Sequence, residues 1–346
     1  MKLLWTPALV GNSLALSLSV AVSAAVIIAT VRFYKRRRRT ARSSANPGQS
    51  SMNGEAGARA ETGGDPPLSD LLTVIVTTSP IQTNPDLSML RHSLETLNKV
   101  PGLADCTTIV TCDGYQTAHG RVRYKTGRIT PEMARDYDEF VARLSREVEV
   151  GDAPMRNVRL MIFEQRQGFG FAVKAALESC ATRFALVLQH DYPIMRSFDC
   201  AAALRIMAGP EGEGIKYAGL LSTSTIRPKK KVKSFSSKAP HITEVDFYLE
   251  TVFNGSVARG QFIEDTFGQA MLSDCKAGGA VAHAKYKAYI LNDGLQDPMV
   301  GHLDGRALRH GRPYQQFLRR VAASRAATEA ESSTADNSSS SSSGSS

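Results

Sequence analysis

Three polar residues directly follow an apolar run in the middle of the chain. The run is Phe184–Leu188, and Gln189, His190 and Asp191 come next. A strand this apolar is buried, and in open α/β sheets ligands bind at the carboxyl ends of the strands. Asp191 is therefore well placed to hold a divalent cation, Mn²⁺ or Mg²⁺, on a diphosphate, since such cations prefer oxygen ligands. The alternative is an Asp that only caps the next turn.

A glycine-rich turn precedes that strand. Gly168 and Gly170 stand before a helix that we expect to begin near Phe171, with Lys174 one turn into it. Glycine lets the backbone approach a ligand closely and adopt positive φ, so both glycines are candidate ligand-binding residues. A Gly-x-Gly pair is also common in plain turns, which is the competing interpretation.

Carboxylates occur at two further positions that could support chemistry. Asp113 follows the apolar stretch Thr107–Thr111 and precedes a glycine, where an Asp-Gly turn is the simplest interpretation. Glu264 and Asp265 are adjacent, and neighbouring carboxylates can raise the pKa of one of them toward useful base behaviour. The alternative for this pair is an acidic helix N-terminus, which the helix dipole favours.

The order and spacing of these pieces resemble the nucleotide-sugar domain of GT-A glycosyltransferases, most of all the family 2 group. The resemblance covers roughly residues 70–305 and rests on the ordered set of segments rather than on any single segment. The segments are Leu72–Thr78, Thr108–Gly114, Arg166–Lys174, Leu186–Asp191 and Phe262–Ala270.

The resemblance implies an enzyme that moves a sugar from a UDP- or GDP-sugar donor to a hydroxyl of a glycan, lipid or protein acceptor. The transfer would be metal-assisted and inverting. In this family's pattern Asp113 would read the base, Asp191 would hold the metal, and Asp265 would be the catalytic base with Glu264 beside it. Lys174 stands where family members often carry an arginine.

Two positions near the predicted metal need separate comment. Gln189 stands where the family has the first Asp of its Asp-x-Asp motif. A neutral amide can hydrogen-bond a ribose, but it adds no negative charge to hold a cation; His190 is either a second metal ligand or only a neighbour. Towards the end of the domain, His302 resembles the C-terminal histidine that several GT-A enzymes bring back to the metal, although a lone histidine is commonly structural.

The elements that must position these residues alternate along the chain. Four strands are predicted, at Leu72–Val76, Thr107–Thr111, Val158–Glu164 and Phe184–Leu188. Helices are predicted at residues 87–99 and 131–148, from apolar residues at helical spacing. This alternation predicts an α/β fold with a mostly parallel central sheet and helices on both faces, as in Rossmann-like and GT-A domains. We expect this catalytic domain to span residues 68–320.

The N-terminus predicts attachment to a membrane. No charged residue occurs from Leu3 to Val31, and Leu14–Val31 is a run of apolar and small residues followed by a basic cluster. We therefore expect residues 1–39 to hold a single-pass transmembrane helix in a Golgi or ER membrane, with a cleaved signal peptide as the alternative. The basic flank favours a cytosolic catalytic domain, whereas Golgi glycosyltransferases usually have theirs in the lumen.

The remaining composition narrows the class of protein. Residues 40–67 and 321–346 are rich in serine and other small residues, so they are predicted to be a disordered linker and tail. The net charge of +9 is concentrated beside the predicted membrane span, which indicates anionic lipid rather than nucleic acid as its partner. The five cysteines show no Cys-x-x-Cys spacing, which argues against a zinc or disulfide framework.

Two alternatives to a glycosyltransferase remain, and the sequence argues against the first of them. A nucleotidyltransferase would need a basic, glycine-rich loop after the first strand, but Thr77–Pro80 contains no glycine, lysine or arginine. A catalytically degenerate domain, which binds a sugar nucleotide or a partner at the membrane without turning it over, is favoured by the neutral Gln189.

Overall fold

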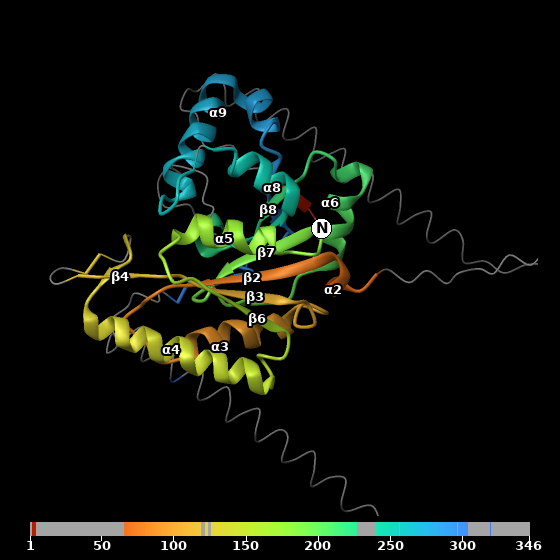
Figure 1. The fold of residues 1–346 in the computed structure, drawn as a ribbon. Coiled ribbons are helices and arrows are strands. Elements are labelled where there is room, and N and C mark those ends of the chain that lie inside the picture. The colour runs from red at the N-terminus through yellow and green to blue at the C-terminus, as the bar shows by residue number, and fades with distance from the viewer. Residues whose placement is uncertain are drawn as a thin grey trace, which may run out of the picture. The chain divides into compact units, whose positions relative to one another are not determined.

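The structure, a computed structural model, describes residues 2–4, 66–118, 122–123, 126–226, 240–255, 257–295, 297–303 and 319. Within these residues the main sheet has eight strands in the order β1-β10-β8-β9-β7-β2-β3-β6, and β4 and β5 form a separate pair (Figure 1). The strands are β1 (Lys2–Leu4), β2 (Leu72–Thr78), β3 (Thr108–Cys112), β4 (Gln116–Thr117), β5 (Arg128–Ile129), β6 (Val158–Ile162), β7 (Phe184–Gln189), β8 (Tyr217–Gly219), β9 (His241–Glu244) and β10 (Ala288–Asn292).

Helices connect most of these strands. The α-helices are α2 (Leu68–Leu71), α3 (Ser88–Glu95), α4 (Pro131–Val150), α5 (Gly168–Glu178), α6 (Cys200–Ala208), α7 (Thr223–Ile226), α8 (Val245–Val252) and α9 (Phe267–Ala284). The 3₁₀ turns are η1 (Thr96–Lys99), η3 (Pro210–Gly212) and η4 (Ile263–Asp265). The helix predicted over residues 87–99 is therefore α3 continued by η1.

The centre of the sheet is parallel, as predicted. Strand β2 pairs in parallel with β7 on one side and β3 on the other, and β3 pairs in parallel with β6. Strand β9 runs antiparallel to both of its neighbours, β7 and β8, and β1 runs antiparallel to β10. Every residue of β2 and β3 is buried, which is why these strands read as continuous apolar or threonine-rich runs rather than as alternating ones.

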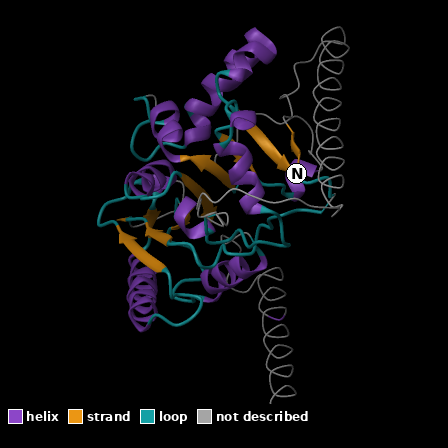
Figure 2. Ribbon diagram, turned by 90° about the vertical axis from the view of Figure 1, so that its right-hand side faces the viewer, coloured by secondary structure: helices purple, strands orange, loops and turns teal. Residues whose placement is uncertain are grey.

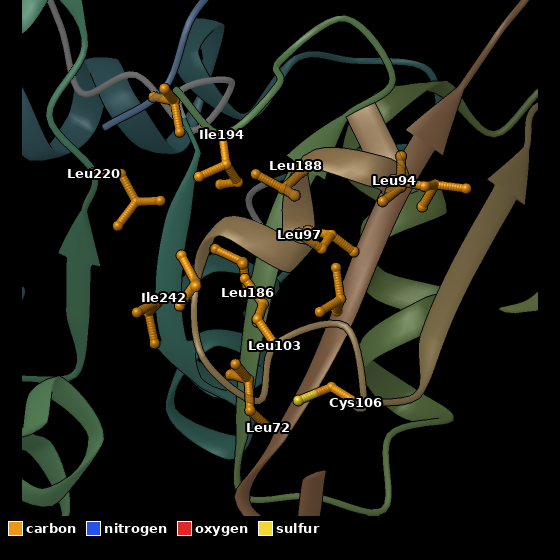
Figure 3. Packing of buried hydrophobic residues seen from close by; sticks show 14 of the residues in the cluster. Leu72, Leu94, Leu97, Leu103, Cys106, Leu186, Leu188, Ile194, Leu220 and Ile242 are labelled. Carbon is orange, nitrogen blue, oxygen red and sulfur yellow. The ribbon is translucent and has the colours of Figure 1, made fainter. Parts of the chain in front are cut away.

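The sheet has a hydrophobic core on each face. Side chains alternate along β2, so that Val74 and Val76 join one cluster and Ile75 joins the other. Figure 3 shows part of the first cluster, where Leu186 and Leu188 of β7 pack near Leu97 of η1. Helices α3 and α4 lie on one side of the sheet and α5 and α8 on the other (Figure 1). Figure 2, turned by 90°, shows helices above and below the strands. The prediction of helices on both faces is confirmed.

Helix α4 shows how local sequence signals set its ends. The Oγ1 of Thr130 accepts a hydrogen bond from the amide of Met133, and Pro131 occupies the first turn. At the other end Gly151 adopts a left-handed conformation with φ of 74°. Tyr137, Phe140 and Leu144 form the buried stripe that packs this helix on the sheet; the helix is two residues longer than the predicted 131–148.

The N-terminal predictions are tested only in part. Among the described residues, no helix is long and apolar enough to cross a membrane. The predicted span, residues 14–31, lies outside the described residues, as do residues 40–65 and the tail from 321 onwards. Residues Lys2–Leu4, which we assigned to the anchor segment, form β1 and pair antiparallel with β10.

Candidate functional site

The carboxyl ends of β2, β3 and β7 border a small cavity of about 80 Å³, here called the edge cavity. It also contacts the first turn of α5 and the segment before η4. Of the residues predicted from the sequence, the cavity brings together Asp113, Gly168, Gln189 and His190. The position agrees with the general rule that ligands of α/β sheets bind beyond the carboxyl ends of the strands.

Asp113 follows β3 and caps α5. Its Oδ1 accepts a hydrogen bond from the amide of Gln167 at 2.7 Å, and its Oδ2 accepts one from the amide of Gly168 at 2.9 Å. Burial raises the pKa of this carboxyl, and the two amides and the charge of Arg166 oppose that rise only in part. This cap explains why α5 begins at Gly168 rather than near Phe171. Asp113 thus caps a helix, in addition to forming the Asp-Gly turn expected from the sequence.

The two glycines of α5 allow a second segment to approach closely. Gly168 has φ of +75°, and a Cβ there would lie 2.9 Å from the Cα of Gly260. A Cβ on Gly170 would lie 3.1 Å from Cγ1 of Ile263, the first residue of η4. Both glycines therefore act by packing the residues before and within η4 against the N-terminal turn of α5.

Arg166 is a functional candidate that the sequence prediction did not include among its site residues. Its side chain lines the edge cavity, and its Nη2 donates a hydrogen bond to the carbonyl of Gly260 at 3.3 Å. A side chain at Gly127 or Gly260 would overlap the guanidinium arm. The signal that could have identified this residue is its place at the start of the Arg-Gln-Gly turn, next to the capped helix.

Gln189 is the last residue of β7 and His190 follows it; both line the edge cavity. The amide of His190 donates to the carbonyl of Thr77 at 3.1 Å, and the ring Nδ1 lies 3.1 Å from the same oxygen. Because a carbonyl can only accept, Nδ1 carries the proton, and in the neutral ring Nε2 is an acceptor. His190 is 8% exposed, and its Nε2 has no hydrogen-bond partner among the described residues.

Asp191 and His302, which the sequence suggested as metal ligands, lie close together. The Nε2 of His302 lies 3.3 Å from the Oδ2 of Asp191, and the imidazole packs on the ring of Tyr192 with centroids 4.6 Å apart. The backbone holds the two segments together, because the amide of Leu303 donates to the carbonyl of Asp191 at 2.9 Å. The Asp191 side chain is buried and that of His302 is half exposed.

This pair fits a divalent cation that completes its shell from a substrate. A carboxylate oxygen and an imidazole nitrogen are both donors for Mn²⁺, and Mg²⁺ sites commonly combine one or two carboxylates with phosphate oxygens. No group of three or more His, Cys, Asp or Glu side chains that could hold a metal occurs within the described residues. The donor set therefore suits a cation shared with a diphosphate rather than a cation enclosed by protein alone.

Besides Gly170, Asp191 and His302, three further predicted residues do not line the edge cavity. Lys174 is on the surface of α5, where its Nζ lies 3.5 Å from Glu178 and 5.6 Å from the ring centroid of Phe171. Glu264 and Asp265 belong to η4 and differ in environment, since Glu264 is buried and Asp265 is exposed. The two neighbouring carboxylates therefore differ in exposure, and neither lines the edge cavity.

A larger cleft of about 770 Å³ lies elsewhere, between the start of α3 and the end of α4. Its charged lining consists of three arginines and three carboxylates, and Arg91 forms an ion pair of 2.7 Å with Glu147. None of the predicted site residues lines this cleft, and its opposite charges balance. We therefore place the candidate site at the edge cavity and at the Asp191–His302 pair.

Comparison with known proteins gives matches only among solved structures. No family model matches the chain, and no curated protein matches it. The solved structures include S. aureus TarS, with 13% identity and a TM-score of 0.36, covering 67% of this chain and 36% of that one. They also include the mannosyltransferase PcManGT from Pyrobaculum calidifontis in complex with GDP-Man and Mn²⁺, with 14% identity, a TM-score of 0.32, and coverage of 67% and 56%.

A third similar structure is GalNAc-T7 with UDP, GalNAc and Mn²⁺, with 12% identity, a TM-score of 0.37, and coverage of 68% of this chain and 44% of that one. The chain therefore spans less than two thirds of the length of these proteins. The mostly parallel sheet covered by helices on both faces fits the GT-A fold that the sequence resembles.

Proposed function

We propose that the chain is a glycosyltransferase that moves a sugar from a nucleotide-diphosphate donor to an acceptor hydroxyl. The observation that carries the proposal is the edge cavity, where a guanidinium, a buried imidazole and a capped helix N-terminus meet at the carboxyl ends of three parallel strands. Arg166 supplies the positive charge there. Arginine side chains are suited to phosphate oxygens, whereas the first amides of α5 already donate to Asp113.

The nucleotide part of a UDP- or GDP-sugar would bind against the edge cavity. The Nε2 of His190, which accepts a hydrogen bond in the neutral ring, suits a ribose hydroxyl or a base N–H. Gln189 adds an amide that can hydrogen-bond a ribose. Asp113 supports the cavity through its two hydrogen bonds to the α5 amides, which hold the Arg166 turn in place.

Asp191 and His302 would hold the divalent cation, Mn²⁺ or Mg²⁺. When bound, the cation acts as a Lewis acid that neutralises negative charge on the diphosphate leaving group. Burial of Asp191 and the packing of His302 on Tyr192 orient the two donors before any ligand arrives. Gln189 contributes no charge, so the site would hold the cation weakly in the absence of the diphosphate.

The acceptor hydroxyl would be deprotonated by Asp265. This carboxylate is exposed at the end of η4, with Thr266 between it and α9, and a base must reach a hydroxyl that arrives from solvent. Attack by the hydroxyl oxygen on the anomeric carbon, opposite to the departing diphosphate, inverts the configuration. The acceptor is a hydroxyl of a glycan, a lipid or a protein.

We also propose that residues 14–31 anchor the chain in a Golgi or ER membrane, with the basic cluster after them on the cytosolic side. Carbonate extraction of membranes from cells that express the full chain tests this proposal. The full chain should stay with the membrane, and a chain lacking residues 14–31 should be released. Release of both would reject the anchor.

Calorimetric titration of the full-length protein with UDP- and GDP-sugars, with and without Mn²⁺, tests the transferase proposal. We expect one donor class to bind, more tightly with Mn²⁺, and Asp191→Asn to remove the dependence on the metal. Asp105→Asn, at an exposed position before β3, is the matched control. Absence of binding to every donor by the folded protein would reject the assignment.

A degenerate binding domain is the second candidate, and Gln189 is the observation that favours it. Asp265→Asn separates the two functions. In a transferase it should lower kcat by about 10²-fold or more and leave donor affinity unchanged. A pure binder should bind donor without measurable transfer or donor hydrolysis, whether or not Asp265 is present. A nucleotidyltransferase is disfavoured, because Thr77–Pro80, which lines the edge cavity, carries no basic residue.

A further inference from the structure

The segment after β10 carries His302 to the candidate metal site. This segment, here called the His302 strap, comprises residues 293–295 and 297–303 of the described chain. Backbone hydrogen bonds hold its last part, since the amide of Gly301 donates to the carbonyl of Pro193 at 3.0 Å. In the first part, residues 293–295, 297 and 298 make no backbone–backbone hydrogen bond to another described residue. The first part of the strap therefore depends on side chains to hold it.

Arg196, in the loop after β7, supplies this support. Its Nη1 and Nη2 donate to the two carboxylate oxygens of Asp293, at 2.6 and 3.0 Å. Its Nε and Nη2 also donate to the carbonyl of Asp297, at 3.1 and 3.0 Å. The side chains of Arg196 and Asp293 are each only 17% exposed, and two parallel hydrogen bonds make such a pair strong and directional. One guanidinium thus binds two residues of the first part of the strap.

The loop that carries Arg196 is fixed to the elements beneath it by buried hydrogen bonds. The Oγ of Ser93, in α3, donates to the carbonyl of His190 at 2.6 Å. The amide of Ile194 donates to the Oγ1 of Thr96, in η1, at 2.9 Å. Because these groups are buried, the loop is a firm base from which Arg196 can hold the strap.

We propose that Arg196 is a positioning residue for the metal site. By binding Asp293 and Asp297, it keeps the strap against the loop after β7. Asp191 and His302 therefore stay within reach of one cation, and Arg196 acts through His302 rather than by touching the cation. The effect on cation binding rests on the proposed function, whereas the hold of Arg196 on the strap is a property of the fold.

The sign of the effect on cation affinity separates positioning from electrostatics. Arg196 carries a positive charge in the loop that follows Asp191, and removal of that charge by itself should favour a bound cation. Positioning predicts the opposite, because a released strap lets His302 move away. We expect Arg196→Ala to lower the affinity for Mn²⁺ in the presence of UDP by about tenfold and to leave the Kd for UDP without metal unchanged. Titration calorimetry measures both, and a gain in Mn²⁺ affinity would overturn the proposal.

A double variant tests whether Arg196 acts through His302. With His302→Ala already present, Arg196→Ala should cause no further loss of Mn²⁺ affinity, because the imidazole that it positions is gone. Independent effects would instead multiply their fold-changes. The full additional loss in the double variant would therefore contradict the positioning role.

Hydrogen exchange of the full-length protein, followed by mass spectrometry of peptides that cover residues 297–303, tests the hold on the strap without metal or donor. Arg196→Ala should accelerate exchange in these peptides by about tenfold or more, because the strap opens more easily. Arg196→Lys keeps the charge but lacks the fork of donors, so it should restore only part of the protection. Wild-type exchange in Arg196→Ala would show that the fork does not hold the strap.

Two further variants keep the outcomes distinct. Arg183→Ala is the matched control, because it removes an arginine ion pair with Glu244 directly before β7, at the opposite end of that strand; exchange in residues 297–303 should not change. If Arg196→Ala does not fold, Asp293→Asn removes the second carboxylate oxygen that the fork requires. This variant should accelerate exchange by about threefold or more, and unchanged exchange would count against the hold on the strap.

The outcome for the wild-type protein separates the two levels of the proposal. If it binds no Mn²⁺ in the presence of UDP, the proposed metal site fails and the positioning role of Arg196 fails with it. The exchange data still decide whether Arg196 holds the strap.

Discussion

The imidazole of His302 lies 3.3 Å from the carboxylate of Asp191, although the two residues belong to segments far apart in the chain. Asp191 follows β7, the central strand next to β2, and His302 is placed by a segment whose amides at Met299 and Val300 both donate to the carbonyl of Leu221. A carboxylate and an imidazole are thereby presented together at the carboxyl edge of the sheet.

Loss of either partner should weaken binding of a divalent cation. We expect Asp191→Asn and His302→Ala each to lower the affinity for Mn²⁺ in the presence of UDP by about tenfold or more, since each removes a donor of a small protein ligand set. Titration calorimetry with Mn²⁺ measures the effect, with Asp105→Asn as the control. Unchanged affinity in both variants would show that the pair is not a metal site.

Arg166 should contribute to binding through the diphosphate and not through the nucleoside. We expect Arg166→Ala to raise the Kd for UDP by about 10- to 100-fold, because a hydrogen bond to a charged group contributes about 1.5–3 kcal/mol. Binding of uridine should change little. Arg135→Ala, at an exposed position on α4, is the matched control. An equal loss for UDP and uridine would indicate that the variant disturbs the cavity as a whole.

Asp113 should act on stability as a helix cap. We expect Asp113→Ala to lower the free energy of unfolding by about 1–2 kcal/mol, since two amides of α5 lose their acceptor. Asp199→Ala is a matched control, because Asp199 caps α6 by accepting from the amide of Ala202. Both variants should unfold at lower urea concentrations than the wild type. Only Asp113→Ala should lower the affinities for UDP and GDP, and it should lower them by similar factors. A change in the ratio of UDP to GDP affinity would instead support direct reading of the base.

Gly168 should tolerate substitution less well than another glycine with positive φ. Gly168→Ala and Gly255→Ala both place a side chain at a left-handed position, which costs about 1 kcal/mol. Only at Gly168 does the new Cβ also approach a backbone atom, the Cα of Gly260; nothing lies within 4 Å of a Cβ at Gly255. We therefore expect an additional loss of about 1–3 kcal/mol at Gly168 from overpacking, measured by urea unfolding. Equal losses would contradict the contact.

The ion-pair network of Glu244 should make stability depend on pH. Burial raises the pKa of this carboxyl, but hydrogen bonds and charges from Lys216 and Arg183, at 2.5 and 2.8 Å, outweigh burial and lower it overall. A carboxyl group whose pKa is lower in the folded state stabilises the folded protein at pH values above its unfolded-state pKa. This contribution to stability is lost as the pH falls through the folded-state pKa.

We expect Glu244→Gln to lower the free energy of unfolding by about 1 kcal/mol at pH 7. The difference from wild type should shrink as the pH falls below about 4, where the wild-type carboxyl becomes protonated. Urea unfolding at pH 7 and pH 3 measures the effect, and Glu250→Gln is the control on α8. A difference of the same size at both pH values would argue against an electrostatic origin.

Much of the fold follows from local patterns. The apolar runs that we assigned to strands are β2, β3, β6 and β7, each within about two residues, because strands buried on both faces admit almost no charged side chain. The amphipathic stripe and the caps of α4 predict that helix equally well. Strand β9 was not predicted, since a four-residue strand between antiparallel neighbours carries too few residues for a periodic signal.

The candidate site could be predicted as a set of positions but not as an arrangement. The amino-acid order places Asp113, Gln189, His190 and Asp191 after buried strands, and parallel strands bring such residues to one edge of the sheet. Which atoms meet depends on contacts between distant segments. The α5 amides engage both oxygens of Asp113, the glycines bring the segment before η4 against α5, and Glu264 is buried while Asp265 is exposed. Local sequence carries the periodicity and polarity of each element, whereas these pairings arise from packing between elements, which no single segment encodes.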